Sequence, residues 1–116
     1  MEDCIFCKIA SGQIPAKMVF EDESVVAFHD LHPAAPVHIL IVPRHHAGDL
    51  LELAADPEGA AIMAAVLQAV PRVAEAAGVA RSGFRLIVNC GEDGGQTIRH
   101  VHFHLIGGRT LGEKLL

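Results

Sequence analysis

Three histidines alternate with apolar residues in the segment from His100 to His104, which has the sequence His-Val-His-Phe-His. A β-strand has a side-chain period of two, so the pattern predicts a strand whose three imidazoles project from one face, each about 6.5–7 Å from the next. Val101, Phe103 and Leu105 then point into a core on the other face. A row of imidazoles would place like charges side by side on protonation, which disfavours a purely structural role. The row suits phosphate or metal binding, proton transfer or nucleophilic attack, with exposed surface histidines as the alternative.

Length and composition predict a single domain over residues 1–116. A chain of 116 residues can build one hydrophobic core, and 51% apolar with 20% charged residues is typical of a globular protein. The net charge of −5 argues against a general nucleic-acid binder, which needs a basic face, but it is compatible with a small nucleotide. The start Met1-Glu2-Asp3 is acidic, and the most apolar stretch, Ala60–Val70, is far shorter than a membrane span. We therefore expect a cytoplasmic protein with no signal peptide and no membrane contact.

The rest of the chain predicts an α+β fold. Segments rich in β-branched and aromatic residues predict strands at residues 18–20, 25–29, 37–42 and 84–89, and a short helix is expected at 4–10. Asp56 is a suitable N-cap for a long helix that runs to Gly78, within which Pro71 should cause a kink or leave a carbonyl unpaired. These elements predict a mainly antiparallel five-stranded sheet with one long and one short helix on one face.

A glycine-rich loop directly precedes the histidine row. Gly91, Gly94 and Gly95 allow positive φ and close backbone approach, so that successive N–H groups can point at an anion. Gln96 and Thr97 add side-chain donors. Such loops are usually simple turns, but next to three histidines an anion site is the better interpretation.

Cys4 and Cys7 have C-x-x-C spacing, and Cys90 is the third cysteine. In a protein expected in the cytoplasm this spacing suggests metal or redox chemistry more than a disulfide, although buried thiols on a short helix are often core residues. Tetrahedral zinc would need two more ligands. The sequence offers these from the histidine row and from His29, His32, His38, His45 and His46.

Taken together, these motifs resemble those of the histidine-triad family. The segment 100–106 has the family signature His-φ-His-φ-His-φ-φ, and the similarity spans residues 4–109. It includes Cys4–Ile9, Gly12–Pro15, Ala27–Asp30, Pro43–His46, Val88-Asn89 and Gly94–Thr97. The resemblance is to the branch of nucleotide-binding proteins that hydrolyse purine nucleoside 5′-phosphoramidates. It implies a homodimer whose two five-stranded sheets join into one, and chemistry that needs no metal.

The resemblance also implies the catalytic and nucleotide-binding residues. His102 matches the nucleophile that forms a covalent nucleotidyl-histidine, His104 matches the residue that contacts the phosphate and leaving group, and His100 supports them. A histidine at position 104, rather than glutamine, favours hydrolases over nucleotidyl transferases. Asp30, which otherwise fits a turn at a strand end, matches the ribose-binding acid. The residues that match positions near the phosphate are Asn89, Gly95, Gln96 and Thr97.

The resemblance implies a structural zinc site as well. In members with a C-x-x-C pair, the residues that match His46 and His100 join the cysteines, here Cys4 and Cys7, as ligands. His45 is an alternative to His46 on spacing alone. The competing interpretation is a metal-free pair of thiols, with His46 and His100 forming a hydrogen-bonded relay.

Two other functions stay open at this point. One is hydrolysis of dinucleoside polyphosphates, and the other is a non-catalytic nucleotide- or zinc-binding adaptor. The segment Thr110–Leu116 lacks the Trp-containing tail of some family members. The resemblance therefore does not define the leaving amine, and the sequence does not distinguish adenine from guanine.

Overall fold

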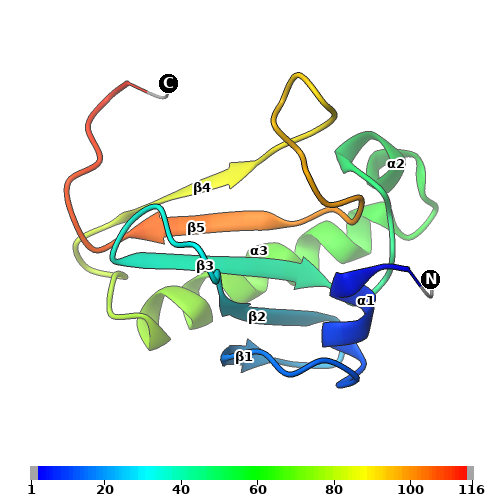
Figure 1. Cartoon of the computed structure of the whole chain (residues 1–116), viewed down its shortest axis with the longest axis horizontal. Helices are drawn as coiled ribbons and strands as arrows, with labels where there is room; N and C mark the ends of the chain where they lie inside the picture. The colour runs from blue at the N-terminus through cyan, green and yellow to red at the C-terminus, as the bar shows by residue number, and fades with distance from the viewer. Residues whose placement is uncertain (1–2, 115–116) are drawn as a thin grey trace.

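The structure is a computed structural model that describes residues 3–114, and this part of the chain forms three helices and five strands (Figure 1). Met1 and Glu2, on which the expectation of no leader partly depends, lie outside it, as do residues 115–116 of the tail. The elements follow in the order α1 (Ile5–Ala10), β1 (Met18–Glu21), β2 (Val25–His29), β3 (Val37–Pro43), α2 (Leu50–Ala55), α3 (Gly59–Ala76), β4 (Phe84–Val88) and β5 (Phe103–Gly107).

The five strands form one antiparallel sheet in the order β1-β2-β3-β5-β4. The predicted fold class, α+β with a five-stranded antiparallel sheet, is therefore confirmed. β5 lies between β3 and β4, where His104 is opposite Leu40 on one side and Ile87 on the other. The histidine row thus enters the sheet at a central strand, while β1 and β4 form its edges.

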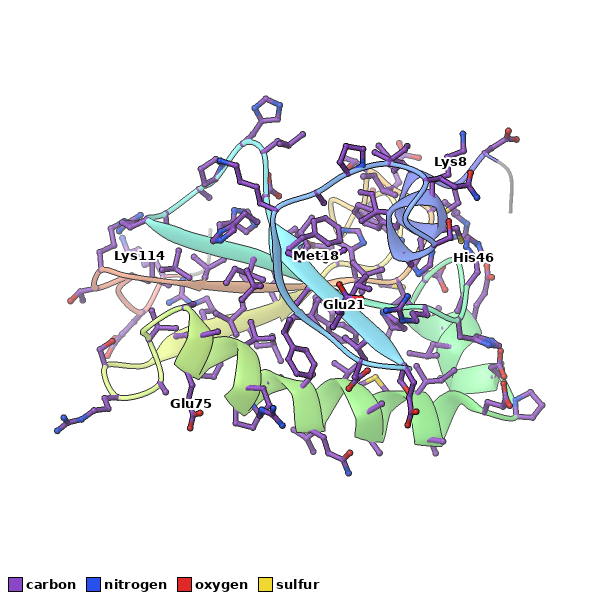
Figure 2. All side chains as sticks on the ribbon, turned by 90° about the horizontal axis from the view of Figure 1, so that it is seen from below. Lys8, Met18, Glu21, His46, Glu75 and Lys114 are labelled. Atoms are coloured by element: carbon purple, nitrogen blue, oxygen red, sulfur yellow. The ribbon has the colours of Figure 1, made fainter. Side chains whose placement is uncertain are left out.

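The helices cover both faces of the sheet, whereas the sequence predicted one covered face. Figure 2 shows α3 along one side and α1 on the other. The α3 face carries the larger core, which includes Val101, Phe103 and Leu105 as predicted. On the opposite face, Phe6 and Ile9 of α1 pack against β2 and β3. The prediction was wrong because two apolar side chains on a six-residue helix do not specify which face of the sheet they cover.

The strand that carries the triad begins at Phe103, not at His100 as the alternation predicted. His100, Val101 and His102 lie in an irregular segment before it. There the His100 amide donates to the Ile98 carbonyl at 2.9 Å, and the Val101 amide donates to the Ala47 carbonyl at 2.8 Å. These bonds replace ladder pairing, so alternation correctly predicts the two faces but not the strand boundary.

The sequence did not predict α2, and it misassigned Asp56. Asp49 is the N-cap of α2, since its side chain accepts a hydrogen bond from the Glu52 amide at 2.9 Å. Asp56 is the C-cap of α2 rather than the N-cap of α3, which is Glu58. The Asp56 carboxylate still accepts from the Glu58 amide at 2.9 Å, so it stabilises the turn between the two helices.

The long helix α3 continues past Pro71 to Ala76. Pro71 has no amide hydrogen for the carbonyl of Leu67, one turn earlier, and both residues are exposed. By length and composition alone α3 is apolar enough to cross a membrane, which the sequence analysis did not anticipate. Its Val66, Val70 and Val73 are instead buried against the sheet, as in the core helix of a globular domain.

A pair of leucines on α2 tests whether this helix forms part of the core. Leu53 is 0% exposed and Leu51 is 72% exposed. We expect Leu53→Ala to lower the free energy of unfolding by about 2–5 kcal/mol, because it leaves a cavity in the α3 core. Leu51→Ala should change it by less than about 0.5 kcal/mol. Urea denaturation of both variants measures the difference, and equal effects would show that α2 does not pack as described.

Candidate active site

His102 has a defined tautomer. Its Nδ1 lies 2.7 Å from the His100 carbonyl oxygen, which can only accept, so the ring proton is on Nδ1 and Nε2 carries a lone pair. The ring is buried, and the Phe6 ring meets it edge-on at 4.9 Å. Burial lowers the pKa of His102, although the His100 carbonyl and Asp30 oppose this shift. The side chain is thus a neutral imidazole with Nε2 available for nucleophilic attack.

His104 has the opposite tautomer, and His38 determines it. The Ala34 amide donates to His38 Nδ1 at 3.0 Å, so the His38 proton is on Nε2. His38 Nε2 lies 2.9 Å from His104 Nδ1 and donates to it, which places the His104 proton on Nε2. Burial, with His102 and His38 close by, lowers the pKa of His104 to about 4. His104 therefore presents an N–H donor beside the lone pair of His102.

The sequence did not predict this role of His38, which it offered only as a possible metal ligand. The signal available was a histidine inside a strand whose other residues are apolar, Val37–Pro43. Asp30, just after β2, lies 3.5 Å from His38 Nε2 through Oδ2, so the predicted ribose-binding acid and the triad form one cluster. Throughout residues 3–114, every buried side-chain nitrogen and oxygen has a hydrogen-bond partner, as a fixed set of tautomers requires.

An apolar cavity of about 560 Å³ lies between α1 and the sheet. Its walls come from α1 through Ile5, Phe6 and Ile9, and from the sheet through Phe28 and Leu40. Phe6 contacts both the cavity and the His102 ring. Asp30 and the neighbouring Leu31, which is 88% exposed, lie at its rim. The volume and the aromatic walls suit a flat, largely apolar group joined to a polar one.

The glycine-rich loop is held by the side chains of two residues that were predicted to bind nucleotide. Gln96 Oε1 accepts from the Gly91 amide at 3.0 Å, while its Nε2 donates to the Gly48 carbonyl at 2.7 Å and to the Ile98 carbonyl at 2.9 Å. Asn89 Nδ2 donates to the Gly94 carbonyl at 2.7 Å. Gly95 has φ +83°, which favours glycine. These contacts shape the loop, and direct nucleotide contact by Asn89, Gly95, Gln96 and Thr97 stays a prediction.

The predicted zinc ligands converge at the other end of the triad. The ligand atoms of Cys4, Cys7, His46 and His100 all lie within 4.8 Å of one another, and Figure 2 shows His46 close to α1. His100 Nδ1 is 3.2 Å from Cys4 Sγ, 3.5 Å from Cys7 Sγ and 3.1 Å from His46 Nδ1, and Cys7 Sγ is 3.3 Å from His46 Nδ1. Tetrahedral zinc would place nitrogens about 3.3 Å apart and nitrogen and sulfur about 3.5 Å apart. The residues therefore fit zinc.

The hydrogen bonds of the cluster also suit a cation. His100 Nε2 donates to the Pro43 carbonyl at 2.8 Å, which directs the Nδ1 lone pair at the thiols, as in a metal ligand oriented by its second nitrogen. Burial lowers the pKa of His100 to about 4, and burial with Cys4 close by raises the pKa of Cys7 to about 11. A cation would displace the thiol protons.

His46, and not His45, belongs to this cluster. His45 faces away from it, with Nε2 2.7 Å from Asp56 Oδ2 and Nδ1 3.5 Å from Glu58 Oε2.

Comparison with known proteins identifies the family to which this chain belongs. Residues 11–111 match the HIT domain, and the chain belongs to the HIT (histidine-triad) family. It is 40% identical over 114 residues to the purine nucleoside phosphoramidase of Escherichia coli K12, covering 98% of this chain and 94% of that protein. It is 42% identical over 107 residues to protein HitA of Neisseria gonorrhoeae, covering 92% and 97%. A HIT family hydrolase from Clostridium thermocellum has a similar structure, with a TM-score of 0.94, 44% identity and coverage of 100% and 99%.

Proposed function

We propose that this protein is a nucleotide hydrolase that cleaves the P–N bond of purine nucleoside 5′-phosphoramidates through a covalent nucleotidyl-histidine. The observation that carries the proposal is the hydrogen bonding that assigns opposite tautomers to His102 and His104. It leaves a lone pair on His102 Nε2 and an N–H on His104 Nε2, in rings whose centroids are 5.1 Å apart. The similarity to the Escherichia coli purine nucleoside phosphoramidase supports the substrate class.

The cavity provides the binding surface for the nucleoside. In this proposal the purine lies between Phe6 and Phe28, and the ribose hydroxyls donate to the Asp30 carboxylate at the rim. That arrangement places the α-phosphate at His102 and His104, with the glycine-rich loop beside it. Phe6 and Phe28 are buried, so they present an apolar surface to the base in this arrangement.

The reaction follows in two steps. His102 Nε2 attacks the α-phosphorus, a P–Nε2 bond forms, and the P–N bond to the amine breaks. The departing amine takes up a proton from solvent, while the His104 Nε2–H donates a hydrogen bond to the phosphate. Positive charge develops on His102, where the Nδ1–H donates to the His100 carbonyl and stabilises it. Water then attacks the same phosphorus, the P–Nε2 bond breaks to restore neutral His102, and the proton released by water passes to solvent. Two displacements replace one difficult attack by water, and the product is a nucleoside monophosphate.

The covalent step is testable by mass spectrometry. Protein quenched in denaturant during turnover of adenosine 5′-phosphoramidate should carry one nucleotidyl group on the peptide that contains His102. His102→Ala should lose the adduct and lower kcat by about 10³-fold or more, because the nucleophile is removed. His45→Ala, whose ring faces Asp56 and Glu58, is the control and should retain both. Faster cleavage of a dinucleoside triphosphate, or nucleotide binding without turnover, would contradict the proposal.

We also propose that Cys4, Cys7, His46 and His100 hold one structural zinc ion. The support is the near-tetrahedral spacing of their ligand atoms and the orientation of His100 by Pro43. The ion would join α1 to the segments before α2 and β5, and no zinc-bound group enters the reaction.

Metal analysis tests this site directly. Protein purified without a chelator or a His tag should contain about one zinc per chain, since all four positions of a structural site are filled by protein. Removal of the zinc, or Cys7→Ser, should lower the melting temperature by several degrees, because metal binding stabilises the folded state. His45→Ala should keep the metal and His46→Ala should lose it. A zinc content near zero, with freely titratable thiols, would rule the site out.

We also propose that the protein forms a homodimer through β4. β4 is an edge strand, and its Leu86 and Phe84 lie opposite Leu105 and Gly107, on the sheet face that α3 covers. Both are exposed, as are Met63 and Leu67 of α3. Edge pairing of two β4 strands would join two sheets and cover this apolar surface, as in a C2 dimer.

Sedimentation distinguishes the dimer from a monomer of 12.3 kDa. We expect twice this mass at micromolar concentration, and a monomer for Leu86→Asp, because a buried unpaired charge disfavours the interface. The matched control is Met18→Asp on β1, the opposite edge of the sheet, since Met18 is 39% exposed and Leu86 is 42% exposed. The wild-type protein sedimenting as a monomer would refute the dimer.

A further inference from the structure

The position of His102 is not determined by strand pairing. The ladder of β5 begins at Phe103, opposite Ile41 and Val88, and His102 precedes it. The segment before β5 is held by backbone bonds from His100 to Ile98 and from Val101 to Ala47. The position of His102 therefore depends on the contacts of the residues before it, His100 and Val101. Val101 is held by the Ala47 carbonyl.

His100 connects the metal-ligand cluster to the nucleophile. Its ring is 0% exposed and anchored at both nitrogens, with Nε2 on the Pro43 carbonyl and Nδ1 among Cys4, Cys7 and His46. Its backbone carbonyl accepts the hydrogen bond from His102 Nδ1 that leaves Nε2 unprotonated. Because the His100 ring is held in place, the orientation of the His100 backbone carbonyl is constrained as well.

The metal-ligand cluster also includes a residue next to Ala47, which holds the segment before β5 through a backbone hydrogen bond. His46 is the residue before Ala47, whose carbonyl accepts from the Val101 amide. Ligation of His46 and His100 by one ion would lock the 46–47 and 100–101 segments together. The first of these stretches is hydrogen-bonded to the second, and the second leads directly into His102.

We propose that Cys4, Cys7 and His46 are positioning residues for the reaction, which act on His102 through His100 when the cluster holds a metal ion. With the cluster loaded, the His100 carbonyl stays in place and His102 keeps the Nδ1–H tautomer. Without metal ligation, the Pro43 carbonyl and the weaker contacts of Nδ1 with the Cys4 and Cys7 thiols hold His100. His102 then exchanges with the Nε2–H tautomer, which has no lone pair to attack phosphorus. The rate then falls with the population of the competent tautomer. The part that concerns turnover rests on the proposed hydrolysis, whereas the tautomer does not.

The test is the side-chain ¹⁵N spectrum of His102 in the resting protein. Four samples are compared: zinc-loaded wild type, chelator-treated wild type, His46→Ala and His46→Cys. The cysteine variant keeps a fourth zinc ligand and is the matched rescue for the alanine variant. We expect the zinc-loaded wild type and His46→Cys to show a protonated Nδ1 and an unprotonated Nε2. The other two should show exchange-averaged shifts at both nitrogens.

Turnover gives the second measurement. We expect kcat for adenosine 5′-phosphoramidate to fall about tenfold on chelation and in His46→Ala, in proportion to the competent population. His46→Cys should restore it, and the Kd of the nucleoside monophosphate should change less than kcat. His45→Ala, outside the cluster, should resemble wild type in every measurement.

The outcomes separate the two proposals. If His102 keeps the Nδ1–H tautomer and kcat is unchanged in the metal-free samples, while only the melting temperature falls, the positioning role is wrong. A wild-type protein that takes up no zinc would overturn it as well. If the tautomer changes with metal but no sample cleaves the phosphoramidate, the coupling stands and the proposed reaction fails. Chelated wild type replaces His46→Ala if that variant does not fold.

Discussion

The hydrogen bond between His102 Nδ1 and the His100 carbonyl is the interaction on which the site depends. An imidazole in water exchanges tautomers and takes up a proton near pH 6.5, so it is a nucleophile for only part of the time. Here a carbonyl two residues away fixes the tautomer, and burial lowers the pKa so that the ring stays neutral. The burial depends on Phe6, whose ring meets that of His102 edge-on, and therefore on the packing of α1 on that face.

One face of the sheet carries the larger hydrophobic core, and the other face carries the candidate site. The α3 face holds the larger core, where Val101, Phe103 and Leu105 alternate with the histidines. The opposite face carries α1, which is too short to be stable alone. α1 nevertheless provides Phe6 for the cavity and Cys4 and Cys7 for the cluster. Because the same short helix contributes to both the cavity and the cluster, a contact that fixes α1 also fixes the cavity wall and the surroundings of His102.

The sequence predicted the elements with strong periodicity, namely the five strands, α3 and the two faces of the histidine row. The family resemblance also implied the set Cys4, Cys7, His46 and His100, and the structure brings these residues together. It missed α2, since six residues give too short a pattern to separate from a loop. It began the triad strand too early, because alternation continues through an extended segment that has no pairing partner. His38 was missed as well, because its role depends on the Ala34 amide and on His104, a contact 66 positions along the chain.

The triad histidines are chemically distinct although they share one sequence pattern. His100 donates through Nε2 and directs Nδ1 at the cluster, and His102 donates through Nδ1 and has a lone pair on Nε2. His104 accepts through Nδ1 and carries its proton on Nε2. Asparagine or glutamine also has a donor and an acceptor, but its nitrogen has no lone pair for phosphorus or a metal. Alternation places the three rings on one face, and their partners at Pro43, His38 and the backbone of His100 determine where each ring proton lies. The order of roles along the triad is therefore set by tertiary structure.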